Sequence, residues 1–331
     1  EKINSRPAQP SGSTVVPVRE SAFDTVLGHS RGLQQVIQLA RKVAVTDVPV
    51  LLTGETGTGK EVFAQAIHNG SARAKQPFVA INCSAFSKEL LESEIFGHKA
   101  GAFTGALKDK KGLFEEANHG TIFLDEIGEM AYGLQAKLLR VLETGEYIKV
   151  GDTKPTKIDV RIVSATNRNL KEEIANSNFR EDLYFRLSVF HLHLPPLRER
   201  REDIPELAAA FLKFFAAKMG KQVKGFAADC QAWMQSYAWP GNVRELRNVI
   251  ERALIICDDY ITLDDMPLDF RSSTLSGSAA DGDDFELAEA EHRHIQRVLQ
   301  YTKGNKAEAA RLLKIGLTTL YRKIEEYGIN I

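Results

Sequence analysis

Apolar and polar positions follow one pattern in the first part of this chain and another further on. Between residues 21 and 195, short apolar and β-branched runs alternate with longer segments whose apolar residues recur at helical spacing. The runs cover residues 48–53, 78–82, 121–125 and 160–165. Continuously apolar strands are buried on both faces, as in a parallel sheet with helices on either side. The pattern therefore predicts an α/β domain over residues 21–195.

From residue 196 onward the strand pattern stops. Residues 204–219 and 242–257 carry apolar side chains at helical spacing, which predicts an all-helical subdomain over residues 196–270. Serine, glycine and aspartate then replace core-forming residues over 271–284. That composition is typical of a flexible tether between two folded parts.

The last predicted domain, residues 285–331, contains three short helical segments. They are expected at residues 286–301, 306–313 and 318–327. Asn305 can cap the second helix, and the small residues Ala309 and Ala310 allow it to pack closely against the third. This compact arrangement is typical of a helix-turn-helix, although an α-helical hairpin used for protein contact fits the spacing as well.

Composition narrows the class of protein further. The 331 residues are 43% hydrophobic and carry a formal charge of −1, so any surface that binds nucleic acid or membrane must be local. The chain has three widely separated cysteines, Cys83, Cys230 and Cys257, and no C-x-x-C pair, so neither a disulfide framework nor a zinc site is indicated. No apolar run reaches the ~18 residues of a membrane span, and no secretory pattern opens the chain. A cytoplasmic protein without membrane contact is expected.

Residues 1–20 are rich in proline, serine and charge and do not begin with methionine. They are expected to form a linker exposed when a longer protein is trimmed. The domain before this linker could be a phosphorylated receiver of a two-component system, a ligand sensor or another module.

A phosphate-binding loop follows the first apolar run. Glycines permit the tight turn whose N–H groups surround a phosphate, and Lys60 would neutralise the β- and γ-phosphate oxygens. Glu61 stands where such loops usually carry a Mg²⁺-binding Ser or Thr. By itself the motif could be a chance glycine-rich turn. It reads Gly54, Glu55, Thr56, Gly57, Thr58, Gly59, Lys60 and Glu61.

Two acids close the third apolar run. Asp125 is expected to hold Mg²⁺, and Glu126 to orient and polarise the attacking water. Alone, such a pair is usually a strand meeting solvent. Combined with the phosphate loop, it indicates nucleotide hydrolysis.

These motifs, with Asn167 after the fourth apolar run, resemble the Walker and sensor I elements of AAA+ ATPases. Between the Walker motifs lies a small flexible loop with one aromatic residue, which taken alone would be an ordinary surface turn. It resembles the GAFTGA hexapeptide of bacterial enhancer-binding proteins, the sigma-54-dependent transcription activators. The hexapeptide consists of Gly101, Ala102, Phe103, Thr104, Gly105 and Ala106.

The resemblance implies an AAA+ parallel-sheet ATPase domain with a helical lid, followed by a Fis-like helix-turn-helix domain. It also implies roles for single residues near the nucleotide. Asn167 would contact the γ-phosphate or the water, Arg244 would contact phosphates as sensor II, and Asn82 would pair with Glu126 as a switch. Without the resemblance, Asn82 would be a strand-end cap. Glu61 is normal in the family, and His98 is interpreted as structural.

Arg180 and Arg186 match the family's arginine fingers, which would reach into a neighbouring subunit's site. Two arginines on a helix would otherwise be a solvated face. Fingers acting between subunits imply a homo-oligomeric ring, expected to be a hexamer, with a dimer as the inactive form.

In the last domain, the resemblance implies contacts between the third helix and enhancer DNA. The residues that would make these contacts are Thr318, Thr319, Arg322 and Lys323. The first helix would supply a dimer face through Leu287, Ile295, Val298 and Leu299.

The predicted function is a sigma-54-dependent activator that binds enhancer DNA, assembles a ring and uses ATP hydrolysis to remodel sigma-54 RNA polymerase holoenzyme. Two alternatives remain from the sequence: an AAA+ motor of helicase or clamp-loader type acting on DNA, and a repressor without productive hydrolysis. Target promoters and the activating signal stay open.

Overall fold

The computed structural model describes residues 20–267, 287–302 and 304–329. Two compact units divide between Arg271 and Ser272. The expected tether at 271–284 lies outside the described residues, as does the expected linker at 1–20 apart from Glu20. No helix of the described residues combines the length and apolar character needed to cross a lipid bilayer.

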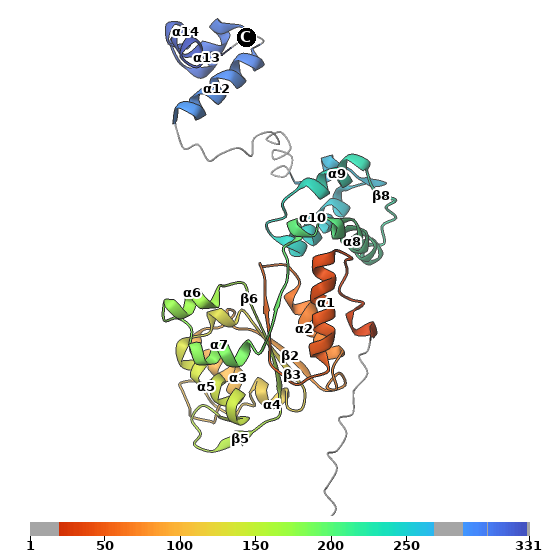
Figure 1. Cartoon of the computed structure of the whole chain (residues 1–331), viewed down its shortest axis with the longest axis vertical. Helices are drawn as coiled ribbons and strands as arrows, with labels where there is room; N and C mark the ends of the chain where they lie inside the picture. The colour runs from red at the N-terminus through yellow and green to blue at the C-terminus, as the bar shows by residue number, and fades with distance from the viewer. Residues whose placement is uncertain (1–19, 268–286, 303, 330–331) are drawn as a thin grey trace, which may run out of the picture. The chain divides into compact units, whose positions relative to one another are not determined.

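A five-stranded parallel sheet forms the centre of the first unit, in the order β2-β3-β6-β1-β7. Its strands β2, β3 and β6 are labelled in Figure 1. The strands are β1 (Val50–Thr53), β2 (Phe78–Asn82), β3 (Thr121–Asp125), β6 (Arg161–Thr166) and β7 (Phe190–His193). The four predicted strands are present within two residues at each end. The fifth was missed because β7 is an edge strand whose exposed positions are histidines, which interrupt the apolar run.

Helices cover both faces of this sheet, as the apolar strands predict (Figure 1). On one face, α1 (Arg31–Ala44) and α2 (Lys60–Asn69) pack over a core that includes Val50, Leu52 and Phe123. The other core includes the alternate residues Leu51 and Leu124. Its helices include α3 (Lys88–Phe96), α4 (Leu113–Glu116), α5 (Tyr132–Thr144), α6 (Leu170–Ala175) and α7 (Glu181–Leu187). A hairpin of β4 (Glu146–Ile148) and β5 (Pro155–Lys157) lies outside the sheet.

The lid of the first unit has its own core around Trp233 and Trp239. Its helices are α8 (Ile204–Met219), α9 (Ala228–Ser236) and α10 (Asn242–Ile256), reached through short 3₁₀ turns at Leu197–Glu199 and Arg201–Asp203. The lid is not entirely helical as expected, because Gly225–Phe226 and Tyr260–Ile261 form a two-residue parallel pair. So short a pair leaves no strand pattern in the sequence.

The second unit consists of α12 (Leu287–Tyr301), α13 (Lys306–Leu313) and α14 (Leu317–Glu326). Asn305 caps α13 by accepting a hydrogen bond from the N–H of Glu308 at 3.2 Å, as predicted. The core joins all three helices through Ile295, Leu299, Ala309, Ala310 and Leu320.

Candidate active site

The phosphate loop runs from the end of β1 to the start of α2. Gly59, at the N-cap of α2, has a φ of 104°, a conformation that favours glycine. Gly57 has a φ of 80°, and a Cβ there would lie 2.3 Å from the main-chain oxygen of Gly241 in the lid. The loop therefore leaves no room for a side chain at the point where the lid approaches it.

Lys60 directs its ammonium back into this loop. Its Nζ donates hydrogen bonds to the main-chain oxygens of Gly54 at 2.9 Å and Glu55 at 3.1 Å, and only 7% of the residue is exposed. Burial lowers the pKa of the Lys60 amine, whereas the carboxylates of Glu126 and Asp125 oppose that shift. A cation is thus held where phosphate oxygens would approach the loop.

Asp125 and Glu126 face the same space from the end of β3. The Glu126 N–H donates to Asp125 Oδ1 at 3.0 Å, and Glu126 has a φ of 52°, which is unusual for a residue other than glycine. Both acids line a cavity of about 240 Å³ together with Lys60 and Arg244. The structure thus brings the predicted cation and acids together around one cavity.

The lid contacts the phosphate loop directly. The N–H groups of Val243 and Arg244, at the start of α10, donate to the main-chain oxygen of Gly57 at 3.0 and 3.3 Å. Arg198 forms a two-point ion pair with the carboxylate of Glu55 at 2.7 and 2.6 Å, and this pair lowers the pKa of Glu55 to about 2. Sequence reasoning missed Arg198, because only the fold brings residues 143 positions apart together.

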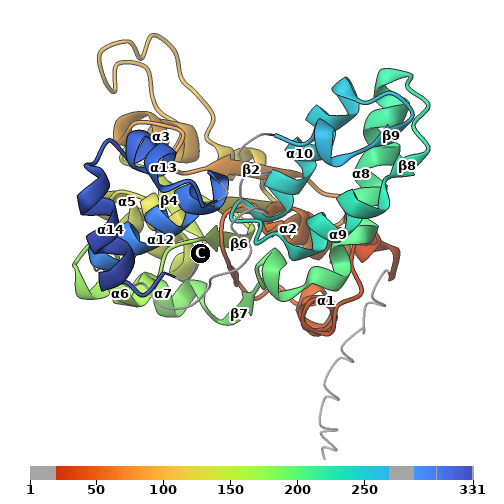
Figure 2. The ribbon, with the colours of Figure 1, turned by 90° about the horizontal axis from the view of Figure 1, so that it is seen from above.

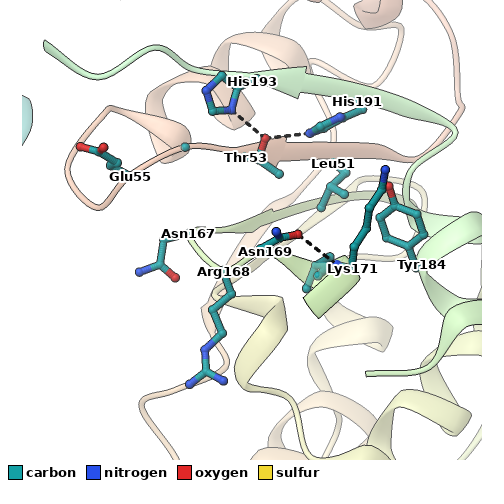
Figure 3. Close-up of a pocket in the computed structure, with 12 residues that line it drawn as sticks. Leu51, Thr53, Glu55, Asn167, Arg168, Asn169, Lys171, Tyr184, His191 and His193 are labelled. Carbon is teal, nitrogen blue, oxygen red and sulfur yellow. Dashed lines mark hydrogen bonds between the residues drawn. The ribbon is translucent and has the colours of Figure 1, made fainter. Parts of the chain in front are cut away.

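Asn167 lies on the other side of the loop, where its Nδ2 donates to Thr56 Oγ1 at 3.0 Å. It lines a second cavity of about 340 Å³ at the carboxyl ends of β1, β6 and β7 (Figure 3). In that cavity the Thr53 hydroxyl lies between two ring nitrogens, 2.7 Å from His191 Nε2 and 3.1 Å from His193 Nδ1 (Figure 3). Neither histidine was singled out from the sequence.

The expected pairing of Asn82 with Glu126 is absent from this structure. The Asn82 side-chain oxygen instead accepts hydrogen bonds from the N–H and hydroxyl of Ser84 at 2.8 and 2.7 Å. Among the hydrogen bonds of the described residues, none joins Asn82 to Glu126. The asparagine caps the end of its strand through its side-chain oxygen. A carboxylate only accepts hydrogen bonds, so pairing with Glu126 would use the Asn82 Nδ2 group and not this oxygen.

Arg180 and Arg186 do not line either cavity beside the phosphate loop. Arg180 immediately precedes α7, forms an ion pair with Asp182 at 2.7 Å and lies 5.5 Å from the centre of the Tyr132 ring. Arg186, on α7, lies 3.6 Å from Glu143 and is largely exposed. Both guanidinium groups therefore lie outside the two cavities beside the phosphate loop of their own chain.

The hexapeptide at residues 101–106 forms part of the loop between α3 and α4, which projects from the domain (tan, Figure 2). An ion pair between Lys99 and Asp109 at 2.7 Å closes its base. Phe103 is 42% exposed and packs edge-on against the His98 ring, with ring centres 5.0 Å apart. His98 itself is buried and bonded to Ser93 at 2.7 Å, in agreement with its structural interpretation.

Comparison with known proteins identifies the domains that carry these features. The profile of the sigma-54 interaction domain matches residues 26–193, and that of the AAA+ ATPase lid domain matches residues 198–282. The profile of the Fis family of bacterial regulatory proteins matches residues 286–327. The chain belongs to the sigma-54 activator family.

Named relatives of this activator agree with that membership. The alginate biosynthesis transcriptional regulatory protein AlgB of Pseudomonas aeruginosa is 47% identical over 307 residues, covering 92% of this chain and 68% of AlgB. The DNA-binding transcriptional regulator NtrC of Escherichia coli is 41% identical over 330 residues, with 92% and 70% covered. The protein is thus an NtrC-like sigma-54 activator.

Solved structures support the enzymatic assignment of this sigma-54 activator. NtrX from Brucella abortus in complex with ADP is 36% identical, has a TM-score of 0.72 and covers 94% of this chain and 71% of its own. NtrX in complex with ATP has a TM-score of 0.71 and covers 92% and 69%. The central domain is an AAA+ ATPase that binds ATP.

In the Fis-type domain of this activator, the predicted DNA contacts separate into two groups. Thr318, Thr319 and Arg322 are exposed on α14. Lys323 instead donates to Glu291 Oε2 at 2.8 Å and to the Tyr327 hydroxyl at 3.1 Å, so it holds α14 against α12. The prediction that Lys323 faces DNA does not agree with this arrangement.

The expected dimer face on α12 is also corrected. Ile295 and Leu299 are buried in the core of their own domain, and Val298 packs against that core. The side chain of Leu287 lies outside the described residues. Three short helices need these apolar side chains for a core of their own, which removes them from an intermolecular surface.

Proposed function

We propose that this sigma-54 activator hydrolyses ATP in the cavity beside Lys60 and uses the reaction to remodel sigma-54 RNA polymerase. Lys60 would neutralise the β- and γ-phosphate oxygens, and Glu126 would orient and polarise the attacking water. Arg244 would contact phosphates from the lid, and Asn167 would contact the γ-phosphate or the water.

Asp125 is the residue that would hold Mg²⁺. Magnesium is commonly bound through one or two carboxylates together with substrate phosphates and waters, and a single carboxylate beside the phosphate loop fits that requirement. Mg²⁺, when bound, would neutralise charge on the transferring phosphoryl group. The protein's own groups position the phosphates and the water around it.

Ring assembly is proposed from the location of the two finger candidates. Arg180 and Arg186 lie outside their own nucleotide cavity, and their nearest partners are the acids Asp182 and Glu143. A neighbouring subunit that received them would gain positive charge where the phosphoryl group is transferred. We therefore infer a homo-oligomeric ring, with a hexamer as the expected size and a dimer as the inactive form.

One observation carries the transcriptional part of the proposal. The loop of residues 101–106 exposes Phe103 and Thr104 from a base fixed by the Lys99–Asp109 pair, within the domain that contains the ATP site. Nucleotide-driven movement of this loop would press its tip against sigma-54. Thr318, Thr319 and Arg322 would bind the enhancer DNA that holds the activator near the promoter.

The test is promoter opening by sigma-54 holoenzyme at a sigma-54 promoter, with ATP compared to a non-hydrolysable analogue. Opening only with ATP is the expected result. Hydrolysis without opening, accompanied by stimulation of hydrolysis by DNA, would overturn the proposal and favour a motor that acts on DNA itself. DNA binding without measurable hydrolysis would favour a repressor.

A further inference from the structure

The lid contacts three successive main-chain oxygens of the phosphate loop, those of residues 56–58. The distances range from 2.8 to 3.3 Å. The donors are the Asn242 side-chain amide, the N–H groups of Val243 and Arg244, and the Arg200 guanidinium. Since each peptide of the loop carries its N–H and C=O on opposite sides, a peptide that turns its N–H toward a phosphate also moves the oxygen that the lid contacts.

The ion pair between Glu55 and Arg198 adds a side-chain connection to these main-chain contacts. Both side chains are 42% exposed, and an exposed ion pair typically stabilises a fold by only about 0–1 kcal/mol. Its two parallel contacts, at 2.7 and 2.6 Å, restrict the orientation of both groups. The geometry therefore favours a role in orientation over one in stability.

Asn242 connects this ion pair to the lid. Its side chain is fully buried, donates to Glu55 Oε2 at 3.1 Å and accepts from the Leu197 N–H at 2.7 Å. Its φ of 53° lies in the left-handed region, which asparagine adopts more readily than most residues other than glycine. Arg244 lies two residues further along α10, so the contacts of Asn242 with Glu55 and Leu197 also help to position Arg244.

We propose that Glu55, Arg198 and Asn242 form a latch that couples the conformation of the phosphate loop to the position of Arg244. They act as positioning residues for hydrolysis, because none of them has to touch the reacting atoms. A shift of the loop on nucleotide binding moves Glu55, and the latch carries that shift to the first turn of α10. This inference rests on the proposed contact between Arg244 and the nucleotide phosphates.

Steady-state ATP hydrolysis by the full chain tests the latch. Arg198→Gln is expected to lower kcat about tenfold and to change KM for ATP less than about threefold, since misplacing a charged group by ~1 Å can slow a reaction up to ~100-fold. Glu55→Gln removes the charge from the other side and should reproduce the effect. Arg201→Gln, at an exposed arginine of the same segment, is the matched control and should retain the parent kcat.

A double-mutant cycle separates positioning from general support of the fold. In an Arg244→Ala background, Arg198→Gln should change kcat less than about twofold, because the group it positions is already gone. A tenfold loss that persists in that background would overturn the latch, and so would parent-like kcat for both Arg198→Gln and Glu55→Gln. Parent-like hydrolysis by Arg244→Ala alone would instead refute the phosphate contact on which the inference rests.

Thermal unfolding of each variant, measured in parallel, identifies any variant that fails to fold. If Arg198→Gln fails to fold, Glu55→Gln replaces it in the double-mutant cycle.

Discussion

The ammonium of Lys60 lies 2.9 Å from the main-chain oxygen of Gly54, the residue that opens the phosphate loop. A second oxygen, that of Glu55, lies 3.1 Å away. The main chain of the loop thus supplies two hydrogen-bond acceptors to the buried ammonium. The oxygens of a phosphate share its negative charge and form stronger hydrogen bonds to an ammonium than carbonyl oxygens do. ATP is therefore expected to take Lys60 from these two carbonyls.

Lys60→Ala should weaken ATP binding about 30- to 150-fold, which corresponds to the loss of one charge-assisted contact of about 2–3 kcal/mol. Titration with a fluorescent ATP analogue measures the affinity. Lys42→Ala, at an exposed lysine in the last turn of α1, serves as the control and should bind like the parent. Equal affinities for the two variants would contradict the assignment of Lys60.

Glu126→Gln should retain ATP binding but slow turnover by about 10²- to 10⁴-fold, the contribution typical of general acid–base groups. The amide keeps the size of the side chain and loses the charge that polarises the water. Phosphate release measures turnover, and the ATP titration described above shows whether binding survives. Turnover within a few-fold of the parent would assign the attacking water to another residue.

Much of the fold could be predicted because burial leaves a clear pattern in the sequence. β3 is apolar up to Asp125, so both the strand and the position of the acid at its end follow from spacing. β7 escaped prediction because His191 and His193 occupy the exposed positions of an edge strand. The Asn305 cap and the order of the three helices in the second unit could be predicted for the same reason as β3, because local rules determine them.

The candidate site was predicted where its residues are close in sequence and missed where the fold brings distant ones together. Lys60, Asp125 and Glu126 were found because each belongs to a motif attached to a strand end. Arg198 was missed since its partner is 143 residues away. Lys323 was assigned to DNA because the resemblance to a Fis-like domain implies a DNA-binding third helix, whereas only the packing of α12 and α14 reveals its carboxylate partner.

Thr104→Ala should leave ATP hydrolysis unchanged and abolish activation. Thr104 is exposed on the loop and does not line the cavity beside Lys60, so its loss is expected to remove only the proposed contact with the polymerase. Transcription from a sigma-54 promoter and phosphate release, measured on the same preparation, separate the two activities. Thr153→Ala, at another exposed loop threonine, should retain both. Normal activation by Thr104→Ala would remove the loop from the proposed mechanism.

Arg322→Ala and Lys323→Ala should differ although the residues are neighbours. Arg322 is exposed, so its loss should weaken binding to a random-sequence duplex and reduce the dependence of log K on log salt by about one. Lys323 is bonded to Glu291 and Tyr327, so its loss should mainly lower the melting temperature of the domain. Fluorescence anisotropy at several salt concentrations and thermal unfolding distinguish the two. If Lys323→Ala changed the salt dependence more than Arg322→Ala does, Lys323 and not Arg322 would be assigned to DNA contact.

The charge of Glu55 should contribute to stability only above a limiting pH. The hydrogen-bonded pair with Arg198 lowers the folded-state pKa of Glu55 from 4.5 to about 2. As the pH falls through 4.5, Glu55 takes up a proton in the unfolded chain but not in the folded chain. The stabilisation that the pair provides above pH 4.5 is therefore progressively lost down to about pH 2.

Because the pair is exposed, Glu55→Gln should lower the melting temperature by less than about 3 °C at neutral pH. The difference from the parent should shrink below pH 4.5 and be small at every pH in an Arg198→Gln background. A difference that stays constant from neutral pH to pH 3 would mean that Glu55 is not stabilised as a carboxylate by Arg198.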